Sequence, residues 1–190
     1  MVFAEVLPVG KLKAHARLYD SFLVLGGSFL MALSAQIAIP LPFSPVPITG
    51  QTFAVLVVGM LLGRWRGTAA VLAYLTEGTL GLPVFAGGAA GIAKILGPTG
   101  GYLVSFLPAA YLVGYLAEKG WDRKISTTFL AMILGNVIIF SFGALWLARF
   151  VGLDKALSLG VLPFLAGDVV KIGLATIALP GAWKLLQNRE

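Results

Sequence analysis

The chain has 190 residues, of which 58% are hydrophobic and only 12% are charged, with a formal net charge of +6. Soluble domains carry about 25% charged residues, so this composition is typical of an integral membrane protein. The apolar residues form continuous runs, which indicates helices and argues against the alternating strands of a β-barrel. The chain has no cysteine and one histidine, so disulfides and thiolate or multi-histidine metal sites are excluded, and we expect neither metal nor cofactor.

Six apolar segments follow one another along the chain, at about 21–39, 49–63, 66–82, 99–118, 125–150 and 160–183. A helix needs about 20 residues to cross about 30 Å of hydrocarbon. The second and third segments are shorter, so they must be tilted or lie among other helices. We therefore predict an all-α fold: one domain over residues 1–190 with six transmembrane helices and a short cytoplasmic N-terminal segment at 1–20.

The distribution of basic residues predicts the orientation in the membrane. Loops on one side of the six segments contain three lysines or arginines, and the opposite side contains ten: Lys11, Lys13, Arg17, Arg64, Arg66, Lys119, Arg123, Lys124, Lys184 and Arg189. The positive-inside rule then puts both termini in the cytoplasm of a multi-pass protein of the cytoplasmic membrane. Topology and anionic membrane lipid thus explain the basic excess, and we expect no nucleic-acid partner.

The first segment has a second interpretation. Basic residues, an apolar stretch and then Ala32-Leu33-Ser34 resemble a signal peptide with a small-residue cleavage site. The apolar run continues to Ile39, however, and cleavage would leave five segments with the N-terminus outside. A retained first helix is therefore favoured.

Two connections on the predicted external side stand out. Residues 39–53 contain Pro40, Pro42, Pro45 and Pro47, which forbid a helix and predict a stiff extended stretch. The loop at 83–100 is rich in glycine and contains an apolar residue, Phe85, with no obvious helix to serve. Glycine turns can direct successive N–H groups at an anion or a carbonyl, so we interpret this loop as the lid or wall of an outward-facing pocket.

Two charged residues, Asp168 and Lys171, lie three apart in the last apolar segment and therefore on one helix face. A charge at the centre of a membrane helix costs roughly 2.5–3.5 kcal/mol, so the two form either a structural ion pair or a ligand site. Four other polar residues lie within the predicted membrane, Tyr74 near its middle and most of the set in its outer half. They bind a ligand, reach the interface, join helices or, for Tyr74, pack as an aromatic ring: Gln51, Tyr74, Glu77 and Asn136.

The chain has no phosphate-binding G-x-x-x-x-G-K-[ST] sequence and no H-E-x-x-H, and no nucleophile and base are arranged for hydrolysis. We therefore expect that it is not an enzyme. If it transports a solute, the energy comes from a gradient or from partner chains.

Four stretches in order, PLPFSPVPITGQTFAVLVVGMLLG, YLTEGTLGLPVFAGG, GPTGGYL and the D-x-x-K of Asp168 and Lys171, resemble the BioY family over about Ala35 to Leu185. These proteins are the biotin-binding S components of energy-coupling-factor (ECF) transporters. The resemblance implies capture of biotin from the outside, with a transmembrane T component and two cytoplasmic ATPase subunits as partners. S components commonly carry Ala-x-x-x-Ala on the first helix for docking the T component, and the nearest match is Ser28-x-x-x-Ala32.

The resemblance also suggests a binding mode. Asp168 would accept from the ureido nitrogens of biotin and Lys171 would donate to a biotin oxygen, or Lys171 would bind the carboxylate. Phe85 suits the apolar part of the ligand. The backbone N–H groups of the glycine loop at Gly87, Gly88 and Gly100, with Lys94, are candidates for the carboxylate. A solitary facilitator, a gradient-driven transporter of another small vitamin and a membrane scaffold without transport function remain alternatives.

Overall fold

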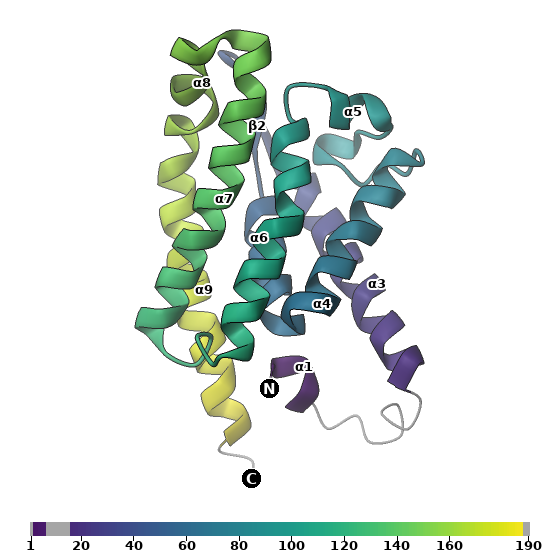
Figure 1. Cartoon of the computed structure of the whole chain (residues 1–190), viewed down its shortest axis with the longest axis vertical. Coiled ribbons are helices and arrows are strands. Elements are labelled where there is room, and N and C mark those ends of the chain that lie inside the picture. Colours follow the sequence, from purple (N-terminus) through teal and green to yellow (C-terminus); the bar gives the residue numbers. More distant parts are fainter. Residues whose placement is uncertain (1, 7–15, 188–190) are drawn as a thin grey trace.

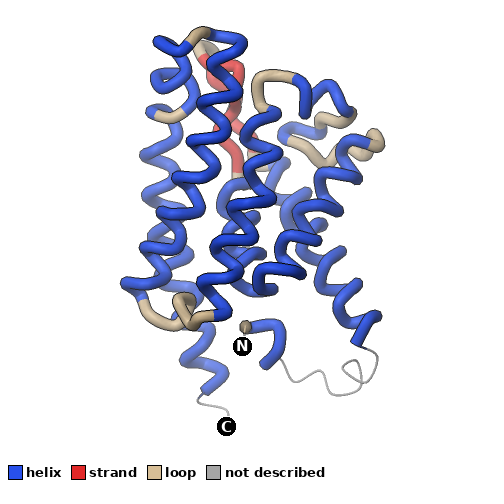
Figure 2. The backbone as a smooth tube through the Cα atoms, in the orientation of Figure 1, coloured by secondary structure: helices blue, strands red, loops and turns tan. Residues whose placement is uncertain are grey.

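The computed structural model describes residues 2–6 and 16–187, so the predicted cytoplasmic positions Lys11, Lys13 and Arg189, together with His15, lie outside the described residues. Five stretches of the described chain are helical, long and apolar enough to cross a membrane. They contain α3 (Ala16–Gln36), α4 (Gln51–Thr79), α6 (Gly100–Glu118), α7 (Ile125–Val151) and, in the last stretch, the short α8 (Leu153–Gly160) followed by α9 (Leu162–Gln187). The prediction of an all-α membrane protein is confirmed at this level (Figure 2).

Helix α4 is folded back on itself, which accounts for the difference between six predicted segments and five long helical stretches. Gly63 has φ +82° and ψ 175°, a conformation that only glycine adopts readily. The side chain of Gln51 at the start of α4 donates to the hydroxyl of Tyr74 near its end. In a straight helix these residues would lie about 35 Å apart. The segments predicted at 49–63 and 66–82 are therefore the two arms of α4.

Small residues let the helices approach closely around this bend. A Cβ atom on Gly67 would lie 2.8 Å from the Cα of Gly59, and one on Gly114 of α6 would lie 2.5 Å from the backbone nitrogen of Arg64. Gly27 of α3 packs in the same way against Ala70. Close backbone approach through glycine is the usual basis of helix association in lipid.

The proline-rich connection forms a two-stranded antiparallel hairpin, β1 (Ala38–Leu41) and β2 (Ser44–Thr49), that reaches into the bundle (Figure 1). The predicted extended structure is thus correct as far as residue 49, whereas α4 already begins at Gln51. Val46 of β2 is buried, and the hydroxyl of Ser44 donates to the carbonyl of Leu159 in α8 at 2.7 Å. The hairpin is therefore fixed to the helices that surround it.

The two ends of the bundle differ in character (Figure 1). The short helix α1 (Phe3–Val6) and the end of α9 lie at one end, which we call the terminal end, and α5 (Ile92–Leu96) and α8 lie at the opposite one, the loop end. At the terminal end, the Phe3 ring meets Trp183 edge-on at 5.8 Å and Tyr19 donates to the carbonyl of Ala4 at 2.7 Å. The candidate site lies at the loop end.

Candidate ligand-binding site

A cavity of about 110 Å³ opens among β2, the start of α4, the segment between α4 and α6, and helices α6, α7 and α9. Four of the residues predicted from the sequence contribute to its lining: Gln51, Phe85, Asp168 and Lys171. Lys94, a further candidate, also lines it. The glycine-rich loop is therefore part of the cavity wall, as the sequence suggested.

The charged pair forms one end of this cavity. The Lys171 ammonium donates to Oδ1 of Asp168 at 2.9 Å and to Oγ1 of Thr52 in α4, also at 2.9 Å. Asp168 is only 4% exposed, and its other oxygen, Oδ2, is buried without a hydrogen-bond partner among the described residues. A buried carboxylate oxygen is costly to leave unpaired, so this end can accept a hydrogen bond from a bound molecule. Thr52 was not predicted, since a threonine at the start of an apolar run carries no signal by itself.

Aromatic side chains form the middle of the cavity. Tyr102 and Phe106 project from α6. Phe140 comes from α7 and Phe164 from α9, and the centroids of their rings are 6.4 Å apart. The hydroxyl of Tyr102 donates to the carbonyl of Gly160 at 2.7 Å, which fixes its ring. These four aromatic residues were not predicted from the sequence. The one signal in the sequence is that Tyr102 and Phe106 are four residues apart, which puts their rings on the same face of a helix.

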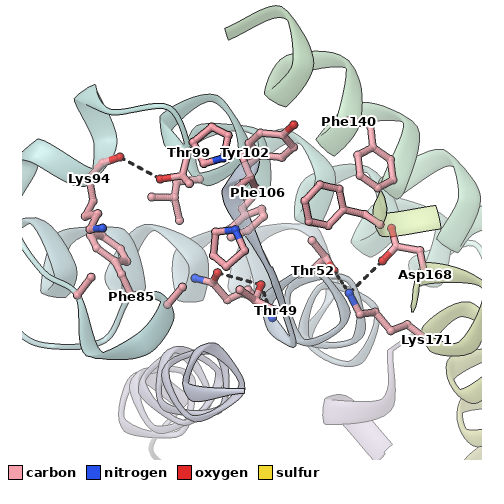
Figure 3. Close-up of a pocket in the computed structure, with 18 residues that line it drawn as sticks. Thr49, Thr52, Phe85, Lys94, Thr99, Tyr102, Phe106, Phe140, Asp168 and Lys171 are labelled. Atoms are coloured by element: carbon pink, nitrogen blue, oxygen red, sulfur yellow. Dashed lines mark hydrogen bonds and ion pairs between the residues drawn. The ribbon is translucent and has the colours of Figure 1, made fainter. Parts of the chain in front are cut away.

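The opposite end of the cavity contains Lys94 and Thr99. Figure 3 shows Lys94 and Phe85 on one side, Asp168 and Lys171 on the other, and Tyr102 and Phe106 between them. Lys94 is exposed, and its backbone carbonyl accepts from the Thr99 hydroxyl at 3.4 Å. The cation Lys94 therefore lies at the opposite end of the cavity from the Asp168–Lys171 pair, and aromatic rings separate the two (Figure 3).

The predicted glycines have a different role. Gly87 and Gly88 have φ values of +66° and +75° in the short 3-10 turn η1 (Ala86–Gly88), so they shape the loop. Neither lines the cavity, and nor does Gly100, whose position leaves no room for a side chain beside Ile95. The N–H groups of Gly88 and Gly100 donate to the carbonyls of Phe85 and Gly97, at 3.0 Å each, within the loop itself.

Three further residues predicted to bind the ligand lie outside the cavity lining: Tyr74, Glu77 and Asn136. Tyr74 is fully buried behind the wall and contacts Gln51. Glu77 accepts from the hydroxyl of Ser28 in α3 at 2.6 Å, and Ser28 is itself fully buried. Asn136 is 7% exposed in α7, with its Oδ1 unpaired within the described part of the chain.

The arrangement suits binding of an elongated small molecule. It offers a buried acceptor and an ammonium at one end, aromatic surface in the middle and a second cation at the other end. No group of three or more histidine, cysteine or acidic residues that could hold a metal occurs among residues 2–6 and 16–187. Fold and site together define a multi-pass helical membrane protein with a small-molecule cavity near one face.

Residues 11–188 match the model of the BioY family, and the chain belongs to that family. It is 43% identical over 148 residues to a probable biotin transporter of Pyrococcus horikoshii, covering 78% of this chain and 86% of the relative. It is 38% identical over 162 residues to a biotin transporter of Rhizobium etli, covering 80% and 86%. The resemblance identified from the four sequence motifs is thus confirmed, and the chain is a transporter-family protein rather than an enzyme.

The fold is similar to a 2.1 Å crystal structure of the S-component for biotin from an ECF-type ABC transporter. The TM-score is 0.80 at 27% sequence identity, and the match covers 90% of this chain and 93% of the other. The similarity therefore extends over nearly all of both chains.

Proposed function

We propose that this protein captures biotin and carries it across the cytoplasmic membrane as the substrate-specific S component of an ECF-type transporter. The observation that carries the proposal is the buried Oδ2 of Asp168, which has no hydrogen-bond partner in the described part of the chain and lies beside Lys171 in the cavity. A ureido ring presents two N–H donors next to a carbonyl acceptor. That set complements a carboxylate oxygen and an ammonium side by side. The family relatives are named as biotin transporters, which supports the same ligand.

One orientation of biotin fits the charges better than its reverse. With the ureido ring at Asp168, one of its N–H groups donates to Oδ2 and its carbonyl accepts from Lys171. The apolar thiophane ring and valeryl chain then lie against Tyr102 and Phe106, and the carboxylate reaches Lys94. In the reverse orientation the carboxylate of the ligand would be buried beside that of Asp168, and like charges in a low dielectric repel strongly.

The proposed topology has six crossings, with each arm of α4 serving as one of them and both termini in the cytoplasm. Residues 1–190 form a single domain, with 1–20 on the cytoplasmic side and the 83–100 loop outside. Arg64, Arg66 and Lys119 belong to the terminal end and Lys94 to the loop end, which agrees with the positive-inside rule. The chain has no cysteine, so Ser126→Cys and Ser158→Cys can be labelled in intact cells with an impermeant maleimide. Only Ser158→Cys should react. Labelling of Ser126→Cys instead would show that the orientation in the membrane is the reverse of the proposed one.

The proposed partners are the transmembrane T component and two ATPase subunits. Helix α3 is the natural docking element, since Phe22, Leu25 and Phe29 are all well exposed along it. Ala32 is half-buried and belongs to this proposed docking face, whereas Ser28 is turned into the bundle towards Glu77. Biotin uptake in cells with and without the ATPase module tests the need for partners. Equal uptake in both would favour a solitary transporter.

Equilibrium binding of biotin to the purified protein tests the proposed ligand. Asp168→Asn removes the buried charge and should weaken binding by roughly ten- to a hundredfold, the range expected for a hydrogen bond to a charged group. Asp154→Asn in α8 is the matched control, because Asp154 is exposed and does not line the cavity, and it should bind as the native protein does. Absence of biotin binding to the native protein would refute the proposal, and unchanged affinity in Asp168→Asn would remove this residue from the site.

A further inference from the structure

The hydroxyl of Tyr74 joins two separate parts of the cavity wall from behind. It accepts a hydrogen bond from the side-chain amide of Gln51, at the start of α4, and donates one to the carbonyl of Val84 at 3.0 Å. Gln51 lines the cavity, and Val84 immediately precedes Phe85, which also lines it. Tyr74 itself is fully buried and does not reach the cavity surface.

The ring of Tyr74 supports the same segment. It meets the ring of Phe85 edge-on, with centroids 5.6 Å apart. On the next turn of α4, Gly78 leaves the space that the Phe85 ring occupies, because a Cβ atom there would overlap that ring. The N–H of Gly91 donates to the carbonyl of Gly78 at 2.7 Å and closes the segment from its other end. Residues 84–91 are thus fastened to the second arm of α4 at several points.

From these contacts we infer that Tyr74 is a positioning residue of the ligand site, which holds Gln51 and Phe85 in their places in the wall through its hydroxyl without touching the ligand. This inference rests on the proposed binding of biotin. Loss of the hydroxyl leaves the Gln51 amide and the Val84 carbonyl without their partner in a buried place. The ligand would then have to order the wall on binding, and this ordering lowers the affinity. A wall that is already ordered before binding avoids that loss.

The test is Tyr74→Phe beside the control Tyr19→Phe. Tyr19 is also a buried tyrosine whose hydroxyl donates to a backbone carbonyl, but it lies at the terminal end of the bundle. Both variants should lower the melting temperature by a similar amount. Only Tyr74→Phe should weaken biotin binding, by about tenfold and mainly through faster dissociation. Native affinity in Tyr74→Phe, or equal weakening in both variants, would overturn the inference.

Two further measurements address the mechanism. Amide hydrogen exchange without ligand should be faster at residues 82–91 in Tyr74→Phe than in Tyr19→Phe, and equal exchange would contradict the inference. Gly78→Ala displaces the Phe85 ring directly, so Tyr74→Phe combined with Gly78→Ala should bind little more weakly than either single variant. Fully additive losses would mean that Tyr74 and Phe85 act separately. If the native protein binds no biotin at all, the proposed function fails, and the exchange data still decide whether Tyr74 holds this segment.

Discussion

Lys171 in α9 donates to the hydroxyl of Thr52 in α4 at 2.9 Å, a contact between residues 119 positions apart in the chain. The same ammonium is bonded to one oxygen of Asp168. The charge pair is therefore anchored to a second helix, which fixes the direction in which Lys171 points. Oδ2 of Asp168 is left as an acceptor for a ligand.

Thr52→Val removes one acceptor of the Lys171 ammonium while keeping the shape of the side chain. A net hydrogen bond contributes about 1 kcal/mol, so we expect biotin affinity to fall about fivefold. Thr76→Val is the control, because the native Thr76 hydroxyl donates to the carbonyl of Leu72 on an exposed surface of the same helix. Isothermal titration of both variants with biotin measures the two affinities. Equal affinities would mean that Thr52 does not orient Lys171.

Replacing both members of the charge pair should be less damaging to stability than replacing one. Lys171→Met leaves Asp168 buried and uncompensated, which costs about 3–5 kcal/mol. Adding Asp168→Leu removes the unpaired charge, so the double variant should recover most of the melting temperature but bind no biotin. Thermal unfolding in detergent ranks the three proteins. A double variant that melts below Lys171→Met would contradict this account of the pair.

Lys94 should recognise the acidic end of the ligand. Because it is exposed, Lys94→Gln should reduce biotin affinity by only about two- to fivefold, and less at high salt. The neutral amide of biotin should bind equally well to the native protein and to Lys94→Gln. Lys155→Gln, outside the cavity, controls for the loss of a surface charge. Equal losses for biotin and its amide would assign Lys94 a purely structural role.

Replacement by alanine should have opposite effects on stability at two glycines that both lie inside long helices. A Cβ atom on Gly143 of α7 would overlap the ring of Tyr102, so Gly143→Ala should destabilise the protein by about 1–3 kcal/mol and disturb the cavity. No atom of the residues that the structure describes lies within 4 Å of such an atom on Gly173 of α9, and alanine there should be neutral or stabilising by up to about 1 kcal/mol. Melting temperatures of the two variants test this, and a less stable Gly173→Ala would indicate a helix contact at that face.

The loop between α6 and α7 should make stability depend on pH. Burial raises the pKa of Asp122 above its ordinary value of 3.8, although Trp183 donates to its carboxylate at 2.5 Å and Arg123 lies nearby. A raised acid pKa means that the folded state binds the proton more tightly than the unfolded one. The contribution of this carboxyl group to stability is therefore largest below pH 3.8 and is lost as pH rises through the folded pKa.

Asp122→Asn removes this titration, so the melting temperature of the variant relative to the native protein should increase as pH rises above 3.8. Melting curves between pH 3.5 and 8 check the effect. A difference that is constant across this range would show that Asp122 does not contribute to the pH dependence.

Much of the architecture was predictable because the membrane imposes it. A hydrocarbon layer demands long apolar helices, so the runs of hydrophobic residues predicted α3, α6, α7 and α9 within a few residues. The prolines at 40–47 excluded a helix, and the structure has a strand hairpin there. Asp168 and Lys171 were recognisable as a candidate site because charge is costly in a membrane helix.

The direction in which each residue faces was not predictable. In a membrane both the lipid-facing and the core-facing sides of a helix are apolar, so the sequence contains little periodicity to tell them apart. The reversal within α4 was implied by the two successive segments predicted at 49–63 and 66–82. Only the packing of the two arms, however, brings Tyr74 beside Gln51 and directs Glu77 to Ser28 instead of to the cavity. The sequence by itself determined the class of protein, the family and the pair of charges. The tertiary structure decided which aromatic rings and which threonine surround that pair, because those contacts join helices far apart in the chain.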